Sequence, residues 1–86
     1  MYSPEDISLL HTALNHVVTA YDISQSKRKS YNRYALAQYL GAVDSIVKRI
    51  SEGHPVRQTI EDACYPPISD NLVKAALQWQ DEVMYV

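Results

Sequence analysis

The chain has 86 residues, of which 47% are hydrophobic, so it is long enough for one small core and too short for two domains. Its net charge of −2 gives no global attraction toward nucleic acid or anionic lipid. It has a single cysteine, no basic and apolar leader at its N-terminus and no apolar run of about 20 residues, which argues against disulfide pairing, secretion and membrane insertion. We therefore expect one domain over residues 1–86, located in the cytoplasm.

The first predicted helix covers about residues 4–22. Ser3 is a favourable N-cap, Pro4 suits the first helical position, and Glu5 and Asp6 complement the helix dipole. Its apolar residues recur at spacings of three and four, with three more widening the stripe: Ile7, Leu10, Leu14, Val17 and Tyr21, then Leu9, Ala13 and Ala20. We expect the helix to end near Tyr21 or Ile23, because the serines that follow favour local backbone hydrogen bonds.

A second helix is predicted over about residues 31–52, after a polar loop. Ser30 or Asn32 can cap it, and Gly53 ends it. Its apolar seam again steps by three and four residues: Leu36, Leu40, Val43, Val47 and Ile50. Gly41 lies inside this helix at a cost of about 1 kcal/mol relative to alanine, so we expect a close helix crossing there to compensate.

Two shorter helices are predicted over about residues 55–64 and 69–82. Consecutive prolines at positions 66 and 67 separate them, and Ser69 or Asp70 can cap the last helix. Its inward residues are expected to be Leu72, Val73, Ala76 and Leu77, with Trp79 either inward or at the surface. The whole pattern predicts an all-α, four-helix domain in which two long antiparallel helices are covered by two short ones.

Half of the basic residues lie in one window of an otherwise acidic chain: Lys27, Arg28, Lys29 and Arg33. Tyrosines interleave with them, and this composition can neutralise phosphates and stack on bases, so non-specific nucleic-acid binding is one hypothesis. A helix-turn-helix is disfavoured because the helix over 69–82 is acidic and the loop before the second helix is too long.

Surface recognition of a protein partner is the leading hypothesis, because tyrosine, tryptophan and arginine dominate binding hot spots. The candidate partner-binding residues near the start of the second helix, with the tryptophan, are Tyr31, Arg33, Tyr34 and Trp79. A third hypothesis is homodimerisation through surplus apolar seam, since so small a core is marginal alone. The compact acidic character also resembles that of small accessory proteins of bacteria and their phages.

Catalytic and metal-binding patterns are weak in this sequence. His11 and His16 are five residues apart and project about 140° from each other on a helix, so they do not form one metal site. Cys64 is expected in the core, and the spacing of the sequence indicates no base beside it. We therefore predict neither an enzyme nor a bound cofactor or metal.

Overall fold

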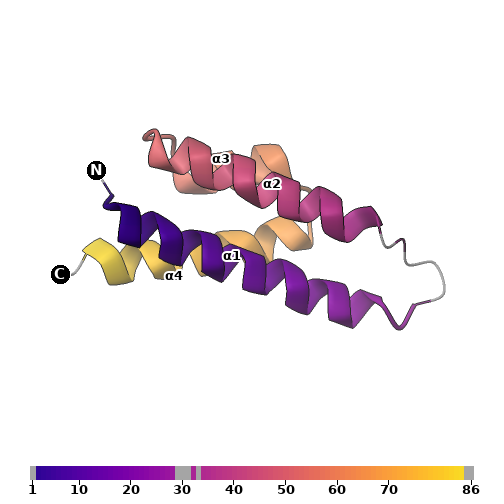
Figure 1. Cartoon of the computed structure of the whole chain (residues 1–86). Coiled ribbons are helices and arrows are strands. Elements are labelled where there is room, and N and C mark those ends of the chain that lie inside the picture. The colour runs from indigo at the N-terminus through magenta and orange to yellow at the C-terminus, as the bar shows by residue number, and fades with distance from the viewer. Residues whose placement is uncertain (1, 29–31, 33, 85–86) are drawn as a thin grey trace.

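A computed structural model describes residues 2–28, 32 and 34–84, and it confirms the all-α four-helix class. The helices are α1 (Pro4–Gln25), α2 (Tyr34–Ser51), α3 (Val56–Ala63) and α4 (Ile68–Met84). Helix α1 packs along both α2 and α4, while α3 packs on α2 and α4, so the chain closes a ring of four neighbouring helix pairs. Figure 1 shows α1 and α4 running antiparallel in one layer, with α2 and α3 in the other. None of the described helices combines the length and apolarity needed to cross a bilayer.

Helix α1 begins where the sequence predicts and ends later. The Ser3 hydroxyl accepts a hydrogen bond from the Asp6 amide at 3.1 Å, and the Asp6 carboxylate accepts one from the Ser3 amide at 3.3 Å, which completes a capping box. The serines expected to end the helix instead donate to carbonyls three residues back, Ser24 to Tyr21 at 2.7 Å and Ser26 to Ile23 at 2.8 Å. These bonds are compatible with helical backbone, so α1 continues to Gln25.

Helix α2 begins at Tyr34, later than predicted. The Asn32 carboxamide oxygen accepts a hydrogen bond from the Tyr34 amide at 2.9 Å, and Ser30, the other expected capping residue, lies outside the described residues. The predicted close crossing at Gly41 is wrong. Gly41 is exposed, and a Cβ built on it would meet nothing within 4 Å.

Helix α4 is longer than predicted and starts one residue earlier. Ser69 is therefore not a cap: it lies in the first turn and is buried. With 17 residues, α4 nearly equals the 18 of α2, so only α3 is a short helix. The pair α1 and α4 consequently forms a layer of its own, and its outer side is a surface that α2 and α3 do not cover.

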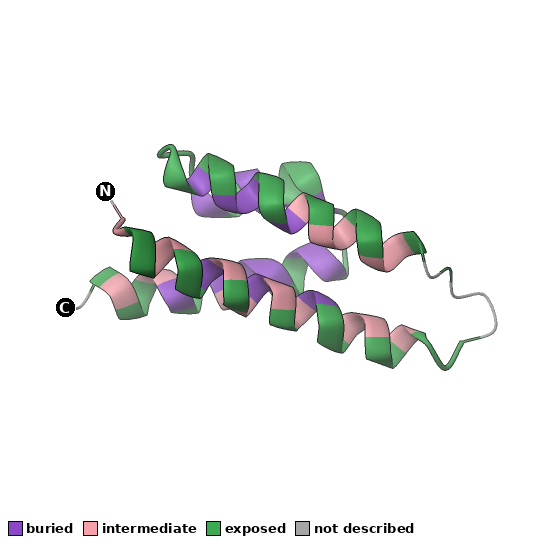
Figure 2. Ribbon diagram, in the orientation of Figure 1, coloured by how far each residue is buried: buried purple, intermediate pink, exposed green. Residues whose placement is uncertain are grey.

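The core lies between the two layers, as the purple segments in Figure 2 show. Its fully enclosed side chains come from all four helices: Leu10, Leu14, Val18, Val43, Ile46, Ile60, Ile68, Leu72 and Ala76. On α1 Val18 is fully enclosed together with Leu10 and Leu14, whereas the expected Val17 is only half-buried. Because α1 has helices on two sides, its apolar surface is wider than one seam, and Val17 faces the outer side of the α1 and α4 pair.

Candidate functional site: the outer groove of α1 and α4

Of the four residues proposed for partner binding, the structure describes Tyr34 and Trp79. Tyr34 lies in the first turn of α2 with 78% of its surface exposed, while Tyr31 and Arg33 lie outside the described residues. Trp79 is only 4% exposed and lies in α4. The expectation that Trp79 is a surface anchor is therefore wrong, although its ring has another role.

Trp79 joins α4 to the beginning of α1. Its indole Nε1–H donates a hydrogen bond to the Asp6 carbonyl oxygen at 2.7 Å, and the Tyr2 ring lies 4.7 Å away, tilted by 49°. The Tyr2 hydroxyl in turn accepts from the Gln80 side chain at 2.8 Å. An indole needs a partner for its N–H when buried, and here the α1 backbone supplies it. Trp79 thus fixes how α1 and α4 lie together.

A groove runs along the outer side of α1 and α4, and sequence reasoning missed it. Two hollows of about 430 and 630 Å³ share His16, Val17, Ala75 and Gln78, so they form one continuous depression. The remaining lining of the groove is contributed by Asp6, Leu9, Thr12, Ala13, Ala20, Tyr21, Ser24, Asn71, Lys74, Trp79, Glu82 and Val83. The sequence carried one signal of the groove: Leu9, Ala13 and Ala20, which widen the apolar stripe of α1, all line it.

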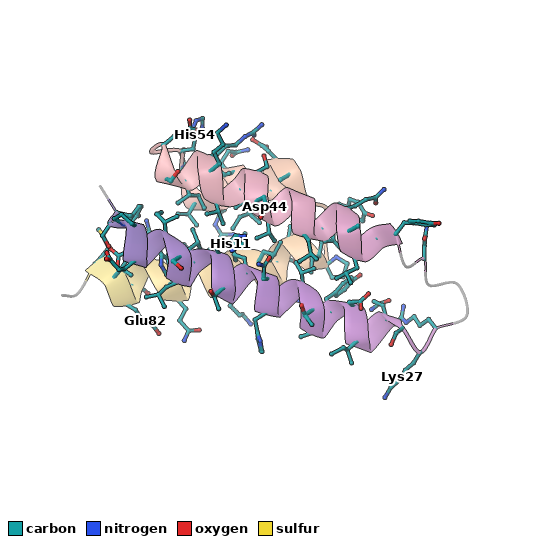
Figure 3. All side chains as sticks on the ribbon, in the orientation of Figure 1. His11, Lys27, Asp44, His54 and Glu82 are labelled. Atoms are coloured by element: carbon teal, nitrogen blue, oxygen red, sulfur yellow. The ribbon has the colours of Figure 1, made fainter. Side chains whose placement is uncertain are left out.

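The groove has an exposed apolar residue on one side and charged residues of opposite sign toward its two ends. Leu9 lines the groove and keeps 60% of its surface exposed. Among the described residues that line the groove, Asp6 and Glu82 lie at one end and Lys74 toward the other, with His16 between them. Figure 3 shows Glu82 at the end of the molecule where the chain starts and Lys27 at the opposite end.

The turn after α1 carries the described part of the basic window. Lys27 and Arg28 are exposed, and neither forms an ion pair within the described ranges. Ile23 precedes them on α1 with 61% of its surface exposed. Lys29 and Arg33 fall outside the described residues, so the structure neither places nor orients them.

His11 and His16 face different surfaces, in agreement with their spacing. His11 Nε2 lies 2.7 Å from the Asp44 carboxylate, and the Asn15 amide nitrogen lies 3.4 Å from His11 Nδ1. Figure 3 shows His11 and Asp44 pointing toward each other across α1 and α2. Because the His11 side chain is 42% exposed and that of Asp44 is 72% exposed, solvent screens this pair and it is worth no more than about 1 kcal/mol. It orients α1 against α2 and leaves His16 in the groove.

Three tyrosines form a cluster at the edge of the core, on the α1 and α2 side. The Tyr39 ring lies 5.9 Å from Tyr21 and 6.5 Å from Tyr65, in edge-on arrangements, and its hydroxyl donates to that of Tyr65 at 3.3 Å. The hydrogen bond to Tyr65 and burial raise the pKa of Tyr39 to about 12. The neighbouring Cys64 is 8% exposed and belongs to the core, as predicted, and burial raises the pKa of its thiol.

No group of three or more metal-ligating side chains gathers within residues 2–28, 32 and 34–84. Comparison with known proteins found no matching family model, no matching curated protein and no matching solved structure. The groove and the exposed side chains beside it are therefore the features on which a functional proposal has to be based.

Proposed function

We propose that this protein is a small non-enzymatic module that acts by associating with another protein, and that the groove between α1 and α4 is its binding surface. The observation that carries this proposal is the continuous depression with Leu9 exposed along it. An apolar groove between two helices suits the apolar face of a third helix, a common mode of peptide and protein recognition. We further propose that it works in the cytoplasm, because its single thiol is buried and unpaired.

The floor of the groove supports this proposal. Trp79 is held in place by its hydrogen bond to Asp6 and by the Tyr2 ring, so the two groove helices are fixed before any partner arrives. A surface that is already formed loses little conformational entropy on binding. Three alanines are among its lining residues, Ala13, Ala20 and Ala75, and at these positions a partner's side chains can approach the backbone closely.

The experiment is affinity capture of partners with a groove variant and a matched control. Leu9→Asp places a charge in the groove, whereas Ile23→Asp places one at a residue of equal exposure on the same helix outside it. Both variants should keep wild-type helicity, since neither side chain belongs to the core. We expect a partner retained by wild type and by Ile23→Asp to be lost by Leu9→Asp, by more than about 1 kcal/mol when remeasured with purified proteins. Equal binding by all three would contradict the groove as the site.

The exposed aromatic and basic residues near the start of α2 form the second candidate surface for a protein partner. Tyr34 and the two cations Lys27 and Arg28 are exposed in the structure, which is the observation that favours this surface. The combined replacement of Tyr31, Arg33 and Tyr34 by alanine should then weaken a partner complex while leaving helicity intact. Wild-type affinity in that variant would remove this surface from the proposal.

The same basic residues support nucleic-acid binding as an alternative function. Lys27 and Arg28 form no ion pair among the described residues, so they are available to phosphates. Under this alternative, binding to short single- or double-stranded probes weakens steeply between about 50 and 200 mM salt, because counterions are released on association. An absence of binding at the lower salt concentration would eliminate it.

A further inference from the structure

The charged residues of the α1 and α4 groove are arranged with opposite signs on either side of its centre. Lys74, Gln78 and Glu82 follow one another at intervals of four residues on α4, and all three line the groove. Four helical residues span about 6 Å, so a positive and a negative group lie at equal distances on either side of Gln78. All three side chains are exposed and could meet a facing surface.

The apolar side of the groove has the same spacing. Leu9, Ala13 and Val17 are also four residues apart, on α1, and all three line the groove. Ala13 and Gln78, the middle residues of the two stripes, both line the larger hollow. The small Ala13 side chain allows close approach there, while Leu9 projects on one side of it.

We propose that the occupant of this groove is a second copy of the chain, stacked face to face and antiparallel about a two-fold axis at Ala13 and Gln78. This inference rests on the proposed function and names its partner. A two-fold interface must be complementary to itself. In this arrangement Lys74 of each copy meets Glu82 of the other, and Leu9 of each copy covers Val17 of the other.

The charges also select the direction of stacking. If the two copies were stacked in the same direction, Asp6 and Glu82 of one copy would lie beside the same acids of the other. Juxtaposed like charges disfavour association, whereas the antiparallel arrangement makes two opposite-charge contacts. An 86-residue chain also buries a modest fraction of its surface alone, so the apolar area of Leu9 covered on association adds a larger share of the total stability than it would in a big domain.

The test uses two single variants, Lys74→Glu and Glu82→Lys, and their mixture. Each variant alone would form a dimer with two like-charge contacts, so its dissociation constant should rise about tenfold or more relative to wild type. When the two variants are mixed in equal amounts, both contacts in the heterodimer join opposite charges again. The mixture should therefore recover the wild-type dissociation constant in sedimentation equilibrium from micromolar to near-millimolar protein.

Both positions are exposed and outside the core, so circular dichroism should show unchanged helicity for each variant. A wild-type chain that stays monomeric over the whole range, or a mixture that associates no better than its components, would overturn the proposal. If the chain is monomeric and Leu9→Asp still loses a different captured protein, the proposed function stands and only the identity of its partner is wrong. If Leu9→Asp loses nothing either, both fail.

Discussion

Replacing Gly41 by alanine should stabilise the protein. Gly41 lies in the interior of α2, is exposed, and has open space where a Cβ would be placed. Alanine is favoured over glycine in a helix by about 0.8–1 kcal/mol, and nothing nearby opposes that gain. For a domain of this size, 1 kcal/mol corresponds to roughly 4–8 °C in the midpoint of thermal unfolding.

The measurement is thermal unfolding of Gly41→Ala and wild type by circular dichroism, with urea unfolding to give the free energy. Gly53→Ala is the matched control, because Gly53 has a φ of 100° that an alanine rarely adopts. This variant should be less stable than wild type by about 1 kcal/mol or more. A Gly41→Ala variant no more stable than wild type would refute the reasoning. A destabilised one would mean that another surface approaches α2 at this position.

Three further outcomes are expected from the core and its edge. Trp79→Phe should lower the free energy of unfolding in urea by about 2–4 kcal/mol, because it removes the hydrogen bond to Asp6 and leaves a gap beside Tyr2. A decrease below about 1 kcal/mol would contradict the tight packing of Trp79 beneath the groove. Folding raises the pKa of Tyr39 from 10 to about 12, so its contribution to stability is complete below pH 10 and is lost as the pH rises toward 12. Wild type should therefore lose more stability than Tyr39→Phe over that pH range. Equal losses in the two proteins would contradict this expectation. Native Cys64 should react with iodoacetamide far more slowly than the urea-unfolded chain, and equal rates would show that it is accessible.

The features that the sequence predicts correctly are local ones. The Ser3 cap, the proline at the first helical position and the acidic first turn all act within four residues, so the start of α1 could be predicted. The end of α1 could not be predicted, because a serine side chain can hydrogen-bond to the backbone both inside and outside a helix. Ser24 and Ser26 do so inside it.

The groove depends on contacts between residues that are far apart in the sequence, and it could not be predicted. Periodicity indicates that α1 has a wide apolar surface, but it does not say which part of that surface faces which helix. The packing of α2 and α4 on α1 encloses Val18, and the position of α4 places Val17 and Leu9 in the groove. For the same reason Trp79 could be read as inward or as an anchor, and its burial against Asp6 decides between them.

The most direct test of the groove as an association surface is a series of two-dimensional amide NMR spectra recorded from dilute to concentrated protein. Shift changes should follow residues 9–20 of α1 and 71–83 of α4, leave α3 unchanged, and vanish in Leu9→Asp. Concentration-dependent changes confined to the start of α2, or spectra that do not change with concentration, would contradict the claim that a second copy occupies the groove.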